Sequence, residues 1–309
     1  MKKFLLVIAG PTAVGKTSVS IQVAKQLRTE IISADSRQFY REMSIGTAKP
    51  SADQLAAVPH HFISHLSIHD NYNAGKFEQD ALALLNRLFL HHDVVVLVGG
   101  SGLFIKAVLE GFDAIPPADD TVHRNLLKVY DGEGITALQI LLQQLDPVYY
   151  EKVDLNNPRR LIRALTVSIS SGKPFSSFRK SKQVERNFIP VKVGLQLERK
   201  ELIHRINHRA DEMIQHGLLE EAKELFPHRH LPALQTVGYQ ELFDFLEGKI
   251  SFDEAVELIK KNTRDYAKRQ MTWFRKEKDM HWFSAGQEEE IIQLLKRFMI
   301  DDFRVTTDG

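Results

Sequence analysis

A glycine-rich segment near the amino terminus has the residue types that bind phosphate groups. The run Gly10-Pro11-Thr12-Ala13-Val14-Gly15-Lys16-Thr17 follows the P-loop pattern. Its glycines let backbone N–H groups converge on anionic oxygens, Lys16 places a positive charge beside them, and the Thr17 hydroxyl can bind Mg²⁺. All eight residues are therefore predicted to bind a phosphorylated ligand, with Thr17 as the metal ligand.

The flanking residues supply the elements that a P-loop needs. The apolar run 4–9 predicts a buried strand before the loop, and Val19, Val23, Ala24 and Leu27 form the apolar stripe of a helix after it. The positive end of that helix would face the phosphates. This context does not identify the phosphate, because NTPases, kinases and other transferases share the loop.

A carboxylate follows the second predicted strand. Asp35 comes directly after the run 30–34, so it should emerge at the same sheet edge as the P-loop, where open α/β sheets bind their ligands. There it can accept a proton or organise a metal ion. The alternative is a structural role as a helix N-cap or a turn aspartate.

The third predicted strand ends without an acidic residue. The run 94–98 leads into Gly99-Gly100-Ser101-Gly102. P-loop NTPases hold Mg²⁺ with an aspartate at this point, so its absence argues against simple ATP hydrolysis. The glycines instead allow a second close approach of the backbone, with the Ser101 hydroxyl available to a polar substrate group.

These strands, with a later one at 191–197, predict an α/β fold with a P-loop NTPase-like parallel sheet flanked by helices. Residues 116–189 contain helical patterns and no strand signal, which indicates a helical insertion domain. The core domain then comprises residues 1–115 and 190–309. Its carboxyl-terminal part is helical and includes a basic helix at 259–278.

The composition restricts the kinds of site that the protein can contain and its expected location. The chain has 309 residues, a formal net charge of +1 and no cysteine, which excludes disulfides, thiolate metal sites and a cysteine nucleophile. No apolar run is long enough to cross a membrane, and cleavage of a signal peptide would destroy the P-loop. We expect a cytoplasmic protein without a membrane partner. The pairs His60-His61 and His91-His92 lack metal-ligand spacing and predict local hydrogen bonding.

Several segments together resemble a known family, the bacterial tRNA dimethylallyltransferases or isopentenyl-tRNA transferases. The resemblance covers nearly the whole chain, and several of its segments have no counterpart in nucleotide kinases. It rests on residues 10–17, 33–36, 45–50, 59–61, 99–104, 158–165, 237–239 and 263–275.

The resemblance implies an activity and roles for individual residues. The family transfers a dimethylallyl group from dimethylallyl diphosphate to the exocyclic amine of the adenosine 3′ of the anticodon, in tRNAs that read codons starting with U. Arg209 and the P-loop, with Mg²⁺, would hold the pyrophosphate that leaves, and Asp35 would be the general base. Ser101 stands where the family usually has threonine, and Phe104 where it has tyrosine.

The family also implies an RNA partner, the anticodon stem-loop of tRNA. The target base would be flipped out of its stack toward Ser101 and the run Asp35-Ser36-Arg37-Gln38. The helical insertion would contact the RNA, and we expect the protein to act as a monomer. The predicted RNA-contacting arginines are Arg124, Arg159, Arg160 and Arg163.

Two other functions compete with this interpretation. A P-loop small-molecule kinase would fit the loop and the arginine-bearing helix that follows residue 199, but the third strand lacks the acid that supports metal-assisted phosphoryl transfer. A non-catalytic RNA-binding module would use the loop only to sense a nucleotide. If replacing the predicted base Asp35 lowers turnover while RNA binding is retained, the protein is the enzyme and not this RNA-binding module.

Overall fold

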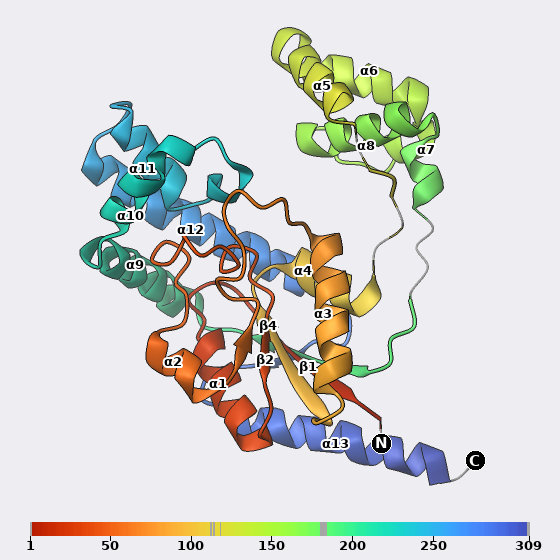
Figure 1. Cartoon of the computed structure of the whole chain (residues 1–309), viewed down its shortest axis with the longest axis vertical. Helices are drawn as coiled ribbons and strands as arrows, with labels where there is room; N and C mark the ends of the chain where they lie inside the picture. Colours follow the sequence, from red (N-terminus) through yellow and green to blue (C-terminus); the bar gives the residue numbers. More distant parts are fainter. Residues whose placement is uncertain (1, 112, 114, 118, 180–183, 308–309) are drawn as a thin grey trace. The chain divides into compact units, whose positions relative to one another are not determined.

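The computed structural model describes residues 2–111, 113, 115–117, 119–179 and 184–307, with side chains as far as Ile300. The chain divides into two compact units, Met1–Leu109 with Arg186–Gly309, and Glu110–Glu185 (Figure 1). The second unit overlaps most of the helical region expected at 116–189. It begins and ends several residues earlier than that range.

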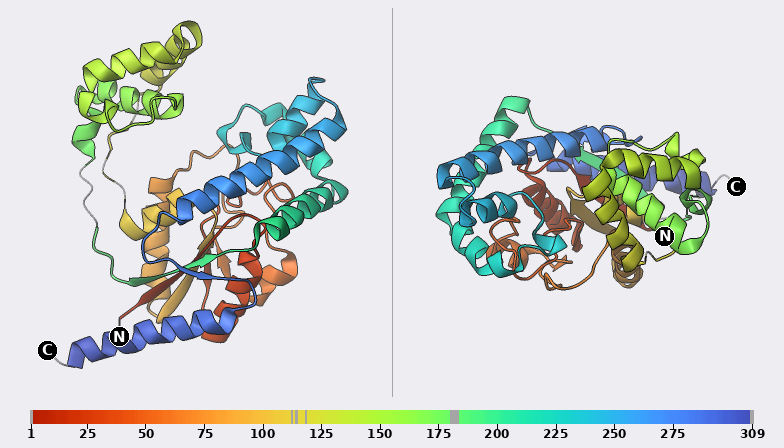
Figure 2. Two further views of the ribbon diagram at one scale, coloured as in Figure 1. Left: turned by 180° about the vertical axis from the view of Figure 1, so that it is seen from behind. Right: turned by 90° about the horizontal axis from the view of Figure 1, so that it is seen from above.

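The first unit is built on a sheet flanked by helices (Figure 2). The sheet has six parallel strands in the order β3-β2-β4-β1-β5-β6. Its strand β1 pairs with β4 and β5, and the valine-rich β4 is fully buried, which suits a strand covered on both faces. The predicted fold class is therefore confirmed. The strands are β1 (Phe4–Ala9), β2 (Ile31–Ser33), β3 (His60–His61), β4 (Val94–Gly99), β5 (Ile189–Leu195) and β6 (His281–Phe283).

Helices cover both faces of the sheet. Alternate residues of β1 point to opposite faces, so Leu6 and Ile8 pack with one group of helices while Leu5 and Val7 pack with another. The first group contains α1 (Lys16–Leu27) and α13 (Glu288–Thr307). The second contains α3 (Ala74–Leu88) and α4 (Gly102–Glu110).

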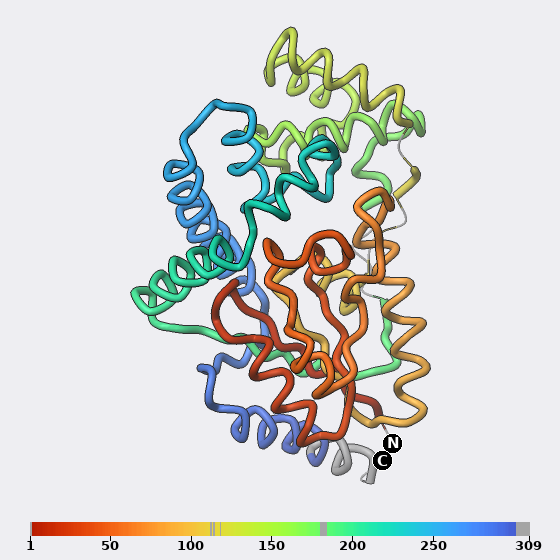
Figure 3. Tube along the Cα trace, turned by 60° about the vertical axis from the view of Figure 1, so that its left-hand side comes forward, coloured from red at the N-terminus to blue at the C-terminus, as the bar shows by residue number. Residues whose placement is uncertain are grey.

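A further helical cluster packs against the segment after β2. Tyr40, Met43 and Ile68 from that segment share an apolar core with helices after β5, and Figure 3 shows these helices beside the loops that follow β1 and β2. The basic helix expected at 259–278 begins earlier, because Ser251 caps it by accepting a hydrogen bond from the Glu254 N–H. The helices are α9 (Arg199–Gln215), α10 (Leu218–Leu225), α11 (Tyr239–Leu246) and α12 (Phe252–Phe274), with α2 (Ala52–Ala57) and 3₁₀ turns at Phe226–His228 and Pro232–Leu234.

The second unit has its own apolar core, which includes Leu138, Leu142, Leu161 and Leu165. Asp146 is fully buried there. Its two carboxylate oxygens accept hydrogen bonds from the backbone N–H groups of Tyr149 and Ser176, so neither oxygen is left without a partner. Its elements are α5 (Asp120–Glu133), α6 (Ile135–Leu145), α7 (Pro147–Tyr150), α8 (Pro158–Ser171) and a 3₁₀ turn at Phe175–Phe178. In the part of the chain that the structure describes, no helix is both long and apolar enough to span a bilayer.

Candidate functional site

The P-loop connects β1 to α1 and holds its lysine close to backbone carbonyls. Gly15 adopts a left-handed conformation with φ of 103°, which favours glycine over residues with a Cβ. The Lys16 ammonium donates to the carbonyl oxygens of Gly10 (3.0 Å) and Pro11 (2.7 Å). Burial lowers the pKa of Lys16 to about 8, although the charge of Asp35 opposes this change. The Lys16 ammonium is hydrogen-bonded to neutral carbonyl groups, so its positive charge remains available to an incoming anion.

A cavity of about 410 Å³ adjoins the P-loop. It brings together most of the residues that the sequence assigned to ligand binding. Val14 is instead buried in the core beneath α1, and Gly10 and Pro11 are outside the cavity lining. The predicted residues that line the cavity are Thr12, Ala13, Gly15, Lys16, Thr17, Asp35, Ser36, Arg37, Gln38 and Arg209.

Asp35 lies on this cavity at the end of β2. Its Oδ1 accepts a hydrogen bond from the Arg37 N–H at 3.1 Å, so it also has the turn-forming role that was its structural alternative. Burial lowers the pKa of both Lys16 and Arg209, and the charge of Asp35 opposes this effect on both cations. One lone pair of the carboxylate organises the turn, while others remain for a substrate proton.

Arg209 reaches the cavity from α9. Burial lowers the pKa of its guanidinium, and the charge of Asp35 opposes that effect. No residue that the structure describes forms a hydrogen bond or an ion pair with Arg209. Arg205, by contrast, forms an ion pair with Glu201 at 2.9 Å on the exposed side of the helix. Arg209 is therefore the arginine of this pair that is available to a ligand.

Ser101 and Tyr266 form a polar group beside Asp35. The Ser101 Oγ accepts a hydrogen bond from the Ser36 N–H at 3.1 Å, which joins the turn after β4 to the turn after β2. Burial, followed by the charge of Asp35, raises the pKa of Tyr266 to about 12, and the Ser101 side chain is among the groups that oppose this change. Tyr266 was absent from the residues predicted for the site.

Arg37 and Gln38 are engaged with the protein itself. The Arg37 guanidinium donates to the carbonyl oxygens of Ala233 (2.8 Å) and Pro232 (3.2 Å), and the Gln38 amide donates to those of Thr47 and Ala48. These bonds hold the cavity wall in place. Contact of either side chain with RNA stays a prediction.

The wall segment at residues 44–48 is held by a carboxylate from α10. Glu221 accepts hydrogen bonds from the N–H groups of Ser44 (2.9 Å), Ile45 (2.8 Å) and Gly46 (3.0 Å). It also accepts one from the Tyr239 hydroxyl at 2.6 Å. A Cβ on Gly46 would lie 2.6 Å from the Tyr239 ring, so this close packing requires glycine.

Gln270 links the P-loop to the second glycine-rich turn. Its Oε1 accepts from the Thr12 N–H and its Nε2 donates to the Gly100 carbonyl, both at 2.9 Å, and the residue is 6% exposed. A Cβ on Gly100 would lie 2.3 Å from Nε2, which accounts for the glycine. One amide thus satisfies a half-buried donor and a buried acceptor from two loops.

We expect Gln270→Glu to destabilise the protein by about 1–3 kcal/mol or more, because a carboxylate oxygen would face the Gly100 carbonyl without a proton between them. Chemical denaturation measures the change in the free energy of unfolding. Gln143→Glu, at an exposed position on α6, is the control for adding one negative charge. Equal effects of the two changes would contradict a role for the amide bridge.

The predicted RNA-contacting arginines lie in the second unit. Arg124 is on α5, and Arg159, Arg160 and Arg163 are on α8; all four side chains are exposed. Asn157 caps α8 by accepting from the Arg160 N–H at 3.2 Å. Their exposure fits a binding surface, and their contact with RNA stays a prediction.

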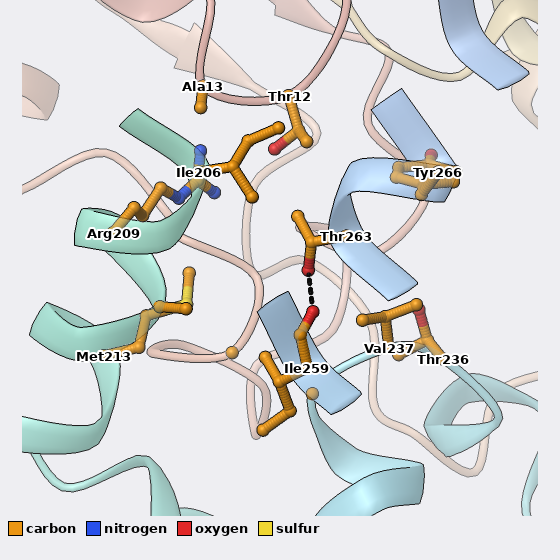
Figure 4. Close-up of a pocket in the computed structure, with 13 residues that line it drawn as sticks. Thr12, Ala13, Ile206, Arg209, Met213, Thr236, Val237, Ile259, Thr263 and Tyr266 are labelled. Carbon is orange, nitrogen blue, oxygen red and sulfur yellow. Dashed lines mark hydrogen bonds between the residues drawn. The ribbon is translucent and has the colours of Figure 1, made fainter. Parts of the chain in front are cut away.

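A smaller, mostly apolar pocket of about 110 Å³ continues from the P-loop cavity (Figure 4). Both hollows are lined by Thr12, Ala13, Arg209 and Tyr266, so they adjoin. Figure 4 shows Arg209 and Met213 projecting from the same helix toward this pocket. The pocket's position beside a phosphate-binding loop suits a short hydrocarbon group attached to a phosphate ester.

The described residues contain no cluster of three or more histidine, cysteine or acidic side chains that could hold a metal ion. The cavity does offer the Thr17 hydroxyl and the Asp35 carboxylate. This small oxygen set fits Mg²⁺, which takes few protein ligands and completes its coordination with water and substrate phosphates.

Comparison with known proteins identifies the family. The model of the IPP transferase family matches residues 38–277. The chain is 53% identical to the tRNA dimethylallyltransferase of Christiangramia forsetii, over 94% of this chain and 97% of that protein. It is 46% identical to tRNA dimethylallyltransferase 1 of Phocaeicola vulgatus, over 96% and 98% of the two chains.

Solved structures agree with the sequence comparison. The full-length tRNA isopentenylpyrophosphate transferase from Bacillus halodurans matches with a TM-score of 0.71 and 35% identity, over 100% of this chain and 99% of that one. A eukaryotic dimethylallyltransferase acting on tRNA matches with a TM-score of 0.74 and 26% identity, over 92% and 74%. The resemblance noted from the sequence motifs is confirmed, and the chain belongs to the IPP transferase family of enzymes.

Proposed function

We propose that this enzyme transfers the dimethylallyl group of dimethylallyl diphosphate to N6 of the adenosine 3′ of the anticodon, in tRNAs that read codons starting with U. The names of its relatives support tRNA as the acceptor. The observation that carries the proposal is a single cavity that presents Lys16, Arg209 and Asp35 and adjoins an apolar pocket. A diphosphate with a short hydrocarbon tail is complementary to both hollows.

The reaction follows from this arrangement. The allylic C–O bond breaks and its electron pair leaves with pyrophosphate, while the adenine N6 forms the new bond to that carbon. Negative charge grows on the leaving group, so Lys16, Arg209 and the P-loop N–H groups stabilise the transition state more than the ground state. Asp35 accepts the proton that N6 loses, and Ser101 would orient the amine.

The Thr17 hydroxyl and the diphosphate oxygens would hold Mg²⁺, with Asp35 on the same cavity. When bound, the ion would supply further positive charge to the leaving pyrophosphate. The exposed arginines of α5 and α8 would bind the RNA backbone electrostatically, which lets a protein with a net charge of +1 bind tRNA. We further propose that the enzyme acts as a cytoplasmic monomer.

The test uses tRNA transcripts and donors labelled in two ways. We expect label from the prenyl carbons of dimethylallyl diphosphate to enter a transcript with adenosine 3′ of the anticodon, and mass spectrometry of its digest to locate it on that nucleotide. A transcript with guanosine there is the matched control. Transfer of the γ-phosphate of ATP to a small acceptor, without prenylation of tRNA, would instead support the kinase alternative.

A further inference from the structure

The apolar pocket beside the P-loop cavity shares lining residues with two neighbouring hollows. One end meets the P-loop, where Thr12, Ala13 and Arg209 border both hollows. Farther along α9 from Arg209, Met213 reaches the pocket (Figure 4). Apolar or uncharged side chains make up much of the lining: Ile206 and Ala210 from α9, Ile259 and Thr263 from α12, and Val237 from the segment before α11.

Met213 also lines a second, larger hollow. It is an open groove of about 680 Å³ between α9 and the segments after β2. Only Arg209 and Met213 line both this groove and the pocket, among the residues that the structure describes. Of these two residues, Met213 is the uncharged one. The groove's apolar lining includes Ile45, Ala48, Pro50, Leu55 and Ile63.

We infer that Met213 forms the end wall of the prenyl pocket and sets the length of the donor chain. The inference rests on the proposed function, since it assumes a prenyl diphosphate held by the P-loop. The pocket volume of about 110 Å³ suits five carbons, because an engineered cavity of about 150 Å³ holds the six carbons of benzene. A ten-carbon tail would have to pass Met213 into the groove, and forcing extra methylenes into a packed site is unfavourable.

Met213→Ala should join the pocket to the groove. We expect the ratio of kcat/KM for geranyl diphosphate to that for dimethylallyl diphosphate to rise at least about 10-fold over the parent, a change of about 1.4 kcal/mol in relative transition-state binding. His216→Ala is the matched control, since His216 lies on α9 and lines the groove but not the pocket. It should leave the donor ratio unchanged.

A second variant tests the same wall from the opposite direction. Met213→Phe should extend into the pocket and raise the KM for dimethylallyl diphosphate several-fold, while the affinity for inorganic pyrophosphate stays within about two-fold because the P-loop is untouched. An unchanged donor ratio in Met213→Ala together with an unchanged KM in Met213→Phe would overturn the inference. Failure of the parent protein to prenylate tRNA would instead overturn the proposed function.

Discussion

Replacing Asp35 by asparagine should lower the rate of prenyl transfer by about 100-fold or more, the usual contribution of a general base. Asparagine keeps the shape of the side chain and can still accept the hydrogen bond from the Arg37 N–H, so the turn should survive. It cannot accept the proton that N6 loses. Single-turnover transfer with saturating donor and tRNA measures the chemical step directly.

The controls separate chemistry from folding and binding. Asp53→Asn, at an exposed position on α2, removes one negative charge away from the cavity and should be active. Binding of tRNA to Asp35→Asn should be largely retained. A rate within a few-fold of the parent protein would refute the assignment of Asp35 as the base.

Lys16→Met should lower kcat/KM for the donor by about 100- to 1000-fold, the range for losing one preorganised donor to developing negative charge. The ammonium now held between the Gly10 and Pro11 carbonyls would be replaced by an apolar group of similar length. Binding of tRNA should change little. Lys25→Met, at an exposed position of the same helix, is the control, and equal losses of donor use and tRNA binding would indicate misfolding instead.

The pH dependence of donor capture provides an independent test of Lys16. Burial lowers its pKa to about 8 in the free protein, so the ammonium loses its charge as the pH rises through that value. We therefore expect kcat/KM for the donor to fall above about pH 8, whereas kcat should hold to higher pH because bound diphosphate favours the charged form. Since the charge of Asp35 raises the pKa of Lys16, Asp35→Asn should move this decline to lower pH.

The sequence predicted the parts of the site that depend on local patterns. The P-loop, the buried runs of β1 and β4, and the position of Asp35 after β2 are each specified within a few neighbouring residues. Short strands were missed, because β3 and β6 contain two and three residues and carry no periodic signal. Their pairing depends on the strands beside them in the sheet.

The missed site residues depend on contacts between distant parts of the chain. Gln270 meets Thr12 across 258 residues, and Glu221 meets Ser44 across 177. Tyr266 is one of the apolar residues that alternate with basic ones in this helix, and no local pattern marks it as a site residue. The closely packed Gly46 and Gly100 were signals of these contacts, but a glycine alone does not identify its neighbour.

The amide bridge between Thr12 and Gln270 has a consequence for biosynthesis. The P-loop leaves the ribosome first, whereas α9 and α12 emerge only when most of the chain has been made. A prematurely terminated polypeptide that lacks α12 therefore contains the entire phosphate-binding sequence but neither the amide that ties it to the Gly100 turn nor the phenol beside Asp35. The donor site can therefore assemble only when translation of the protein is nearly complete.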